Sequence, residues 1–540
     1  FIAYPLSYAQ DEIGVAAAVN TKTVDMVAYP GGNIQNVNVD PGYKIISNRT
    51  IETNKSGKAQ MLLVDGTAFT IGPNSSVTLD KFIYDPATGE VYGELVDSNS
   101  EDIQDAVSSA KDAFASWSGL SFSERADYIM AIADEIDAQS DTFSELESRD
   151  TGKPLSLARS LDIPRSIYNF KFFAKHVKDF KFKRELQNDV SINYIQRMPL
   201  GVVCCISPWN LPLYLFTWKI APALVSGNTV VAKPSEITPS TAHLLGDICT
   251  KVGLPPGVLN IVHGKGSTAG DMLVKNIDIK AISFTGGTST GKKIFKNASG
   301  SFKKLSLEMG GKNPAIIFED CNYELMLETV VRSSFSNQGQ ICLCSSRILV
   351  ESSIYEKFKL DFCSKVSELI VGDPLKLDTE FGAISSEEHF HKIKNYMDLA
   401  NKEGATVLTG GTVEKLSGRC AKGWYFRPTV LEGLSHSSKL NKEEIFGPIV
   451  TLQSFTSESE AIGMANDTDY GLSATIWTED IDKGKRISGG VDSGVIWINT
   501  WLLRDLRTPF GGMKNSGLGR EGGDDALEFF TEQKNICIPK

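Results

Sequence analysis

Long apolar runs are absent from this chain of 540 residues. No stretch approaches the ~18 consecutive apolar residues that a membrane-spanning helix requires, so the sequence predicts no membrane span. Basic residues are in the minority: 55 Lys and Arg stand against 66 Asp and Glu, a formal net charge of −11. Because nucleic-acid binding usually needs a basic face, this balance argues against a nucleic-acid partner.

The nine cysteines lack any regular spacing. The two close pairs, Cys204–Cys205 and Cys342/Cys344, have no second Cys or His pair at zinc-ligand spacing, so no metal site is predicted. An odd number of cysteines in a long chain fits reduced thiols better than a disulfide framework. We therefore expect a cytoplasmic enzyme, and the chain length predicts roughly two to four domains.

Residues 1–80 differ from the rest, since they contain neither Cys nor His. Short β-prone runs at residues 24–28, 59–64, 68–71 and 76–79 alternate with turns rich in Gly and Pro. This spacing predicts a small all-β domain. Residues 63–75 resemble the FecR-like β domains of bacterial cell-envelope proteins, and the resemblance extends over residues about 10–85. Residues 1–10 fit either the end of a signal peptide cleaved after Ala9 or an apolar N-terminal arm.

After a turn at residues 84–90, where we expect a fusion of two genes, helices and strands alternate. Residues 100–117 carry apolar side chains at helical spacing after a polar N-cap at Asn99 or Ser100. Apolar β-branched runs at 202–206 and 229–232 are typical of buried parallel strands. Further helices are expected at 123–137 and 239–252, and further strands at 259–262 and 281–284. This order predicts a doubly wound α/β sheet with ligands at the carboxyl ends of its strands.

Cys342 follows a polar turn at residues 337–340 and is a candidate nucleophile. A cysteine nucleophile needs a nearby base and a donor for the oxyanion that it creates. Glu308 is the candidate base, and the side-chain amide of Asn210 is the candidate donor, together with the Cys342 N–H. Cys344 is the rival nucleophile, and the plainer alternative is a buried structural cysteine.

Short motifs that contain these and other candidate site residues follow one another along the chain. There are six of them, at residues 208–210, 233–236, 284–288, 307–312, 335–344 and 444–448. Together they resemble the NAD(P)-dependent aldehyde dehydrogenase superfamily over residues about 82–540. The resemblance implies the α/β aldehyde dehydrogenase fold and a homodimer or homotetramer. The implied parts are an all-β segment at 1–83, a Rossmann-like NAD-binding domain at 84–186 and 201–307, an α/β catalytic domain at 308–499, and β oligomerisation strands at 187–200 and 500–540.

The Gly-x-Gly-x-x-Gly fingerprint of many dinucleotide-binding proteins does not follow an early strand here. Residues 284–291 instead follow a predicted strand, and their small side chains let backbone amides approach a pyrophosphate. Glu236 can accept hydrogen bonds from ribose hydroxyls and would repel a 2′-phosphate, which favours NAD over NADP. By resemblance, Glu444 holds the nicotinamide ribose and Phe446 packs beside the nicotinamide ring. The predicted cofactor residues are Ile206, Ser207, Pro208, Trp209, Lys233, Ser235, Glu236, Phe284, Thr285, Gly286, Gly287, Thr288, Glu444 and Phe446.

The chemistry that these residues imply has two stages. Cys342 attacks the aldehyde to form a thiohemiacetal, and loss of hydride to NAD leaves a thioester. Glu308 then activates the water that hydrolyses the thioester, and it also helps to deprotonate Cys342. Cys204 and Cys205 lie in an apolar strand, so we expect them to be packing residues.

Residues 499–512 narrow the choice of aldehyde. They resemble the subgroup that acts on 2-aminomuconate and 2-hydroxymuconate semialdehydes, which carry a carboxylate at the end opposite the aldehyde. Arginine suits carboxylates because its planar fork donates two parallel hydrogen bonds, and Arg165 and Arg504 are the candidate clamp. The alternatives are that Arg504 pairs with Asp505 or Glu521, and that Arg165 caps a helix.

Two other functions stay open at this point. One is a betaine-aldehyde or broad aliphatic aldehyde dehydrogenase, which would not need Arg504. The other is an envelope sensing or binding protein led by the FecR-like segment, with a degenerate dehydrogenase body. The presence of Cys342, Glu308, Asn210 and Lys233 argues against degeneration.

Overall fold

The structure is a computed structural model, and it divides the chain into two compact units. It describes residues 82–540 throughout and, before them, residues 12–20, 23–28, 34–41, 43–46, 50–53, 58–63, 68–71 and 76–78. One unit comprises Phe1–Ile83 and Val91–Asp97, and the other comprises Tyr84–Glu90 and Ser98–Lys540. Residues 1–10, which the sequence predicts to be either the end of a signal peptide or an apolar arm, lie outside the described residues.

The described residues of the first unit form two antiparallel four-stranded sheets. One has the order β4 (Lys44–Ile46), β1 (Glu12–Asn20), β6 (Lys58–Leu63), β7 (Ala68–Ile71). The other has the order β3 (Ile34–Asn38), β2 (Thr23–Ala28), β5 (Thr50–Thr53), β8 (Ser76–Thr78). Strands β2, β6, β7 and β8 coincide with the four predicted runs. The prediction of a small all-β segment is therefore confirmed.

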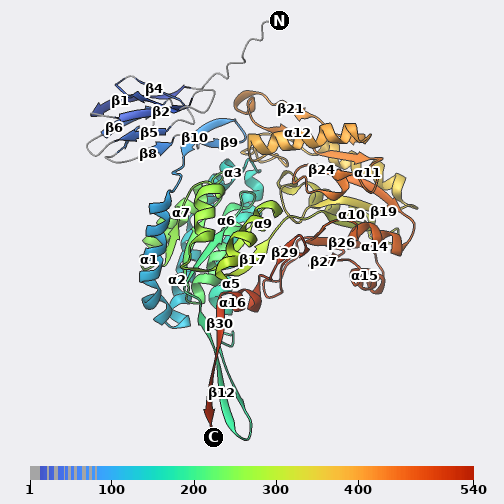
Figure 1. Cartoon of the computed structure of the whole chain (residues 1–540). Helices are drawn as coiled ribbons and strands as arrows, with labels where there is room; N and C mark the ends of the chain where they lie inside the picture. Colours follow the sequence, from blue (N-terminus) through green and yellow to red (C-terminus); the bar gives the residue numbers. More distant parts are fainter. Residues whose placement is uncertain are drawn as a thin grey trace. The chain divides into compact units, whose positions relative to one another are not determined.

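A six-stranded sheet organises the first half of the larger unit (Figure 1). Its order is β15 (Leu259–Ile261), β14 (Thr229–Lys233), β13 (Val202–Ile206), β16 (Ile279–Thr285), β17 (Lys304–Glu308), β29 (Gly517–Leu518), and the first five strands are parallel. The surrounding helices include α1 (Ser100–Gly119), α2 (Phe122–Ala138), α5 (Ile163–His176), α6 (Pro212–Val225), α7 (Ser240–Lys251) and α9 (Thr288–Ala298). Every residue of β13 and β14 is buried, as their apolar runs predicted.

Helix α1 shows how the local sequence sets these elements. The Asn99 side chain accepts hydrogen bonds from the N–H groups of Glu101 and Asp102, and the Asp102 carboxylate accepts one from the Asn99 N–H. This reciprocal capping satisfies backbone donors that a helix start otherwise leaves unpaired. Ile103 and Val107 then face the core, where they pack in one cluster with residues of β13 and β16.

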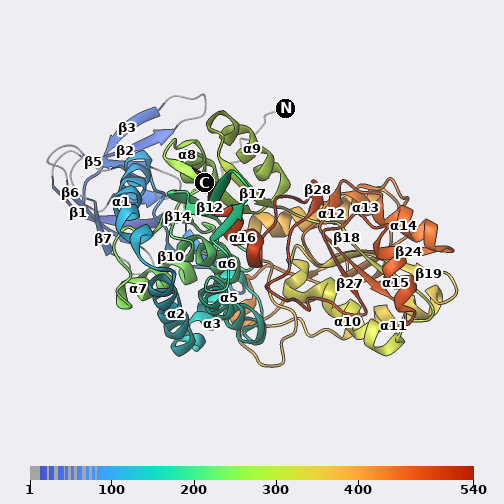
Figure 2. The same cartoon turned by 90° about the horizontal axis from the view of Figure 1, so that it is seen from below.

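A seven-stranded sheet organises the second half of the larger unit, and Figure 2 shows the two halves side by side. Its order is β20 (Thr406–Thr409), β23 (Thr429–Glu432), β24 (Ile449–Phe455), β19 (Ser345–Glu351), β18 (Asn313–Ile317), β26 (Ser473–Trp477), β27 (Val495–Ile498). Its helices include α10 (Tyr323–Phe335), α11 (Tyr355–Glu368), α12 (Glu387–Lys402), α14 (Glu458–Asn466) and α15 (Ile481–Ser488). All its strand pairs are parallel except β20 with β23.

A three-stranded antiparallel arm projects from the larger unit beside the C-terminus (Figure 1). It consists of β11 (Lys183–Gln187), β12 (Ser191–Pro199) and β30 (Thr531–Pro539), and the register of β12 with β30 runs from Ser191 opposite Pro539 to Pro199 opposite Thr531. Strands β12 and β30 lie within the segments 187–200 and 500–540 that were predicted as oligomerisation strands, and they pair with each other. None of the helices in the described part of the chain combines the length and apolar composition that crossing a membrane demands.

Candidate active site

The parallel strands of the first sheet end at a common edge, and the predicted cofactor segments meet there. The register places Ile206, at the end of β13, opposite both Lys233 of β14 and Phe284 of β16. Thr285 lies opposite Glu308, the last residue of β17. Because the chain continues from β13 to β14 on one side and reaches β16 on the other, this edge is the switch point where α/β sheets bind ligands.

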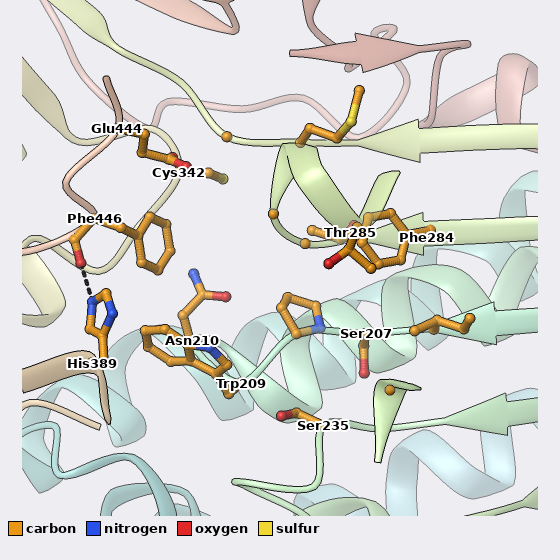
Figure 3. A pocket seen from close by; sticks show the side chains of 18 of the residues that line it. Ser207, Trp209, Asn210, Ser235, Phe284, Thr285, Cys342, His389, Glu444 and Phe446 are labelled. Carbon is orange, nitrogen blue, oxygen red and sulfur yellow. Dashed lines mark hydrogen bonds between the residues drawn. The ribbon is translucent and has the colours of Figure 1, made fainter. Parts of the chain in front are cut away.

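A cavity of about 380 Å³ opens at this edge, within the size range of cofactor sites. All the predicted cofactor residues line it except Thr288, and Thr290 lines it instead. Figure 3 shows Phe446 and Trp209 on one side of this space, Phe284 and Thr285 on the other, and the side chains of Cys342 and Asn210 reaching toward it. Thr288 is the first residue of α9 and does not line the cavity, so its contact with the cofactor stays a prediction.

The turn between β16 and α9 is shaped for an anion. A Cβ added at Gly286 would lie 2.5 Å from the Phe284 ring, so a side chain there would force the turn open. Gly287 is the N-cap of α9 and has open space around its Cα. The first N–H groups of a helix have no partner within the helix and attract negative charge. The residues present therefore fit the pyrophosphate of a dinucleotide.

Two further contacts shape the ends of this cavity. The Lys233 Nζ lies 3.2 Å from Glu236 Oε2, and Glu236 Oε1 accepts a hydrogen bond from the Gly266 N–H at 3.2 Å. The second bond joins the loop after β14 to the loop after β15. The pair presents one ammonium and one carboxylate, which are groups that bind ribose hydroxyls.

At the other end, Glu444 packs into the turn after β17. Its Oε1 accepts a hydrogen bond from the Gly311 N–H at 2.9 Å, and a Cβ at Gly310 would overlap its carboxylate. Phe446 has a left-handed φ of 60°, which is unusual for a bulky side chain. Its carbonyl oxygen lies 2.6 Å from His389 Nε2, and burial lowers the pKa of His389 to about 4. His389 is therefore neutral and donates through Nε2, which holds this strained backbone in place.

Cys342 lies where the cofactor cavity meets a second, smaller cavity of about 60 Å³. The Nδ2 of Asn313 donates to the carbonyl oxygens of Cys342 at 2.7 Å and Cys344 at 2.9 Å, which fixes the loop before β19. Cys344 lines neither cavity, and its Sγ faces the Ser336 carbonyl oxygen at 3.7 Å. The geometry thus singles out Cys342 of the two candidate thiols.

Asn210 lines the cofactor cavity on the side facing Cys342. Its Nδ2 donates to the backbone carbonyl oxygen of Gln340 at 2.8 Å. The backbone carbonyl oxygen of Asn210 accepts a hydrogen bond from Asn337 Nδ2 at 2.9 Å. Since an amide nitrogen carries two hydrogens, one N–H remains for a group in the cavity. The loops that carry Asn210 and Cys342 are therefore joined to each other.

Charges around Cys342 favour the neutral thiol in this structure. Burial raises the pKa of Cys342 above the ordinary range, and the nearby carboxylates of Glu444 and Glu308 raise it further. Burial also raises the pKa of Glu308, and the charge of Glu521 adds to that effect. A thiolate therefore forms only when a nearby group removes its proton. Cys204 and Cys205 are fully buried in β13, and burial raises the pKa of each thiol, as expected for packing residues.

The smaller cavity contains both predicted clamp residues together with Cys342 and Glu308. The guanidinium carbon of Arg504 lies 4.0 Å from the ring centre of Phe510, and that of Arg165 lies 5.1 Å from the ring centre of Tyr214. Both also approach the Trp218 ring, at 5.3 and 5.8 Å. The Nη2 atom of each arginine is buried without a hydrogen-bond partner among the described residues.

The alternative roles for these arginines do not match the contacts. Asp505 pairs with Arg507, and Glu521 pairs with Lys219 at 2.8 Å. Arg165 donates from Nε to a side chain, Asn169 Oδ1, rather than to a helix carbonyl. Within the part of the chain that the structure describes, neither clamp arginine has an ion-pair partner.

Sequence reasoning missed several residues around the two cavities. His389, Lys392 and Met309 line the larger cavity, and Tyr214, Trp218, Phe510 and Glu521 line the smaller one. Met309 lies inside the motif at 307–312 and could have been included. Phe510 lies inside residues 499–512 and could have been included as well. The others belong to helices and loops whose local pattern carries no signal, so only the tertiary structure identifies them.

Comparisons with known proteins agree with this geometry. The sequence profile of the Aldehyde dehydrogenase family matches residues 76–536. A 2-aminomuconic semialdehyde dehydrogenase from Danio rerio is 48% identical over 461 residues, which are 84% of this chain and 94% of the relative. A 2-hydroxymuconic semialdehyde dehydrogenase from Pseudomonas sp. (strain CF600) is 44% identical over 459 residues, with the same coverage of 84% and 94%.

A solved structure is also similar. The crystal structure of betaine aldehyde dehydrogenase from Staphylococcus aureus in complex with NAD+ has a TM-score of 0.82 and 38% identity, and it covers 85% of this chain and 91% of its own. The chain belongs to the aldehyde dehydrogenase family. It is an NAD(P)-dependent enzyme that oxidises an aldehyde to a carboxylic acid, and its α/β aldehyde dehydrogenase fold is confirmed.

Proposed function

We propose that this enzyme uses NAD to oxidise a semialdehyde that carries a distal carboxylate, such as 2-aminomuconate or 2-hydroxymuconate semialdehyde. The observation that carries the proposal is the pair of inward-facing guanidinium groups, Arg165 and Arg504, in the cavity that also contains Cys342 and Glu308. Free donors on a planar cation match a carboxylate. The names of the relatives from Danio rerio and Pseudomonas agree with this choice.

In the proposed first stage, Glu308 accepts the thiol proton and the Cys342 thiolate attacks the aldehyde carbon. The C=O double bond becomes an oxyanion, which accepts hydrogen bonds from the second N–H of Asn210 and from the Cys342 N–H. Loss of one such donor typically costs ~3 kcal/mol. NAD, when bound in the larger cavity, supplies the acceptor for the hydride. Cys342 is then left as a thioester.

In the second stage, Glu308 first releases the thiol proton to solvent and then removes a proton from water, and the hydroxide adds to the thioester carbon. The carbon–sulfur bond breaks, the carboxylic acid leaves, and the Cys342 sulfur is free again. Because Glu308 lines the same cavity as Cys342, it can serve both stages without a change of base. Its raised pKa means that the basic carboxylate form becomes more abundant as the pH rises.

The choice of NAD over NADP rests on Glu236, whose carboxylate borders the larger cavity. A 2′-phosphate would bring a second negative charge beside it, whereas ribose hydroxyls can donate to it. The alternative of a betaine-aldehyde substrate is disfavoured by the smaller cavity. A quaternary ammonium group would be repelled by two arginine side chains, which themselves lie over the aromatic rings of this cavity.

We also propose that the enzyme is a cytoplasmic homodimer or homotetramer with the domain division that the family resemblance implies. Apolar side chains of the arm are exposed in the single chain, which supports association through β12 and β30; they are Leu186, Val190, Tyr194, Met198, Ile536 and Ile538. Apolar patches of this kind usually mark protein–protein contacts. A cytoplasmic location would supply the cofactor.

The FecR-like character of residues about 10–85, and their origin by gene fusion, stay predictions. Deleting residues 1–80 should leave kcat within about twofold of the full-length value, because this segment contains no candidate catalytic residue and surface changes away from a site usually have small effects. Steady-state NADH production by the truncated enzyme checks this. A large loss of kcat in a truncated protein with an unchanged circular dichroism spectrum would show that the segment supports the active site.

Arg504→Ala should lose ~2–4 kcal/mol of transition-state binding for 2-hydroxymuconate semialdehyde, the range for truncating one partner of a buried charge pair. This corresponds to roughly 30- to 1,000-fold in kcat/KM. The loss on hexanal, an uncharged aldehyde with the same number of carbons, should be much smaller. Arg504→Lys should recover only part of the activity, because an ammonium cannot form the bidentate fork.

Arg507→Ala is the matched control, since Arg507 lies three residues further on and pairs with Asp505 at the surface. Its kinetics should match the wild type on both substrates. Equal losses on both substrates for Arg504→Ala would mean that Arg504 supports its loop. The proposed substrate would then be a generic aldehyde and not one with a distal carboxylate.

A further inference from the structure

Asn169 is a fully buried amide on α5, one helical turn after Arg165. Its Oδ1 accepts a hydrogen bond from Arg165 Nε at 3.1 Å. Its Nδ2 donates to the Tyr214 carbonyl oxygen at 3.0 Å and to Thr217 Oγ1 at 3.1 Å, both on α6. The amide therefore links the helix that carries Arg165 to the helix beneath it.

The contacts on α6 decide which way this amide points. If the amide were reversed, its oxygen would face the Tyr214 carbonyl and its nitrogen would face the Arg165 Nε–H, so acceptor would meet acceptor and donor would meet donor. The observed orientation satisfies both Nδ2 hydrogens. It also places the oxygen on the Nε edge of the guanidinium, while Nη2 stays without a partner and Arg165 lines the smaller cavity.

The neutrality of Asn169 is as important as its position. A carboxylate at this site would accept the same hydrogen bond, but it would also pair with the charge of Arg165. Among the described residues no acidic side chain forms an ion pair with Arg165, and its Nη2 has no hydrogen-bond partner. An amide oxygen orients the guanidinium and leaves its charge for a group that enters the cavity.

We propose that Asn169 is a positioning residue that sets the preference for a distal carboxylate, because it aims Arg165 at the substrate without neutralising it. This inference rests on the proposed carboxylate-bearing substrate. It assigns a specificity role to a residue that lines neither cavity and touches the substrate only through Arg165.

The test measures the ratio of kcat/KM for 2-hydroxymuconate semialdehyde to kcat/KM for hexanal. Asn169→Asp should lower this ratio by more than about 20-fold, since the new carboxylate competes with the substrate for Arg165. Asn169→Leu, which has a similar size but no acceptor, should lower it by about tenfold, the value of one hydrogen bond to a charged group. Thr217→Val removes one of the two acceptors that orient the amide and should give a smaller fall in the same direction.

Asn466→Asp is the matched control, because Asn466 is an amide that accepts one N–H, from the Asp492 backbone, and donates to the Gly490 carbonyl oxygen, away from both cavities. Its ratio should equal that of the wild type, and thermal melts identify which variants are folded. Suppose that Arg165→Ala loses the preference for the carboxylate, but the folded Asn169 and Thr217 variants keep a ratio within twofold of the wild type. That result would overturn the role of Asn169 and leave the proposed substrate intact. If the wild type does not prefer the carboxylate, the proposed substrate itself fails. If Arg165→Ala keeps the preference, Arg165 is not part of the clamp and this inference fails while the substrate stands.

Discussion

Cys342→Ala is expected to lower aldehyde oxidation by at least about 10⁴-fold, the order lost when a catalytic nucleophile is removed. Without the sulfur no thiohemiacetal forms, and the aldehyde carbon has no route to release hydride. NAD binding should persist, because the cofactor residues belong to other loops and the thiol is one small part of a cavity of about 380 Å³. Steady-state NADH production measures the first effect, and calorimetric titration with NAD measures the second.

Cys344→Ala is the matched control for that experiment. It removes a thiol two residues further on that is buried and lines neither the cofactor cavity nor the smaller cavity. We expect activity close to that of the wild type, with a modest loss of stability from the missing buried sulfur. An inactive Cys344→Ala enzyme beside an active Cys342→Ala enzyme would reverse the assignment of the nucleophile.

Local sequence signals predicted the strands that build the cofactor edge. The run at 202–206 coincides with β13, because five consecutive apolar residues, several of them β-branched, fit a strand that is buried on both faces. The same argument found β14 to within one residue at its end. Parallel strands have their carboxyl ends at one edge, so the convergence of Lys233 and Phe284 beside Ile206 followed from the order of elements.

Contacts between distant segments had no local signal. His389 contacts the Phe446 carbonyl across 57 residues, and Lys219 contacts Glu521 across 302 residues. In the sequence, His389 is one polar residue in the first turn of an amphipathic helix and Lys219 is one polar residue in an apolar helix. Their roles depend on how α12 and α6 pack, which periodicity does not determine. For the same reason the sequence did not predict the role of Asn169, because its three hydrogen-bond partners lie on two helices.

The two cavities that meet at Cys342 explain why one thiol can serve both substrate and cofactor. Glu444, Phe446 and Asn210 belong to the larger cavity, whereas Arg165, Arg504 and Glu308 belong to the smaller one. Thr285 and Met309 line both, beside the sulfur. A semialdehyde held by its carboxylate at the arginines would therefore extend its aldehyde toward Cys342, with the cofactor on the opposite side.

Glu308→Gln is expected to trap the enzyme as a thioester on Cys342. The amide keeps the shape of the side chain but cannot accept a proton, so hydrolysis should slow by about 10²- to 10⁴-fold, the usual contribution of a general base. Acylation should slow as well, because the Cys342 proton must then pass to water, but NADH production should still show about one equivalent per active site ahead of a slower phase. Mass spectrometry of the intact protein after substrate addition should detect the covalent adduct.

The pH dependence separates the two stages in that variant. Burial and the charge of Glu521 raise the pKa of Glu308, so in the wild type the carboxylate form, and with it the hydrolysis rate, should increase as the pH rises. In Glu308→Gln the slow phase should lose this dependence. Glu319→Gln, the same change at an exposed position after β18, should retain it. An unmodified protein mass during turnover of Glu308→Gln, without a burst, would mean that another group activates the water, and Glu521 beside Lys219 would be the first to examine.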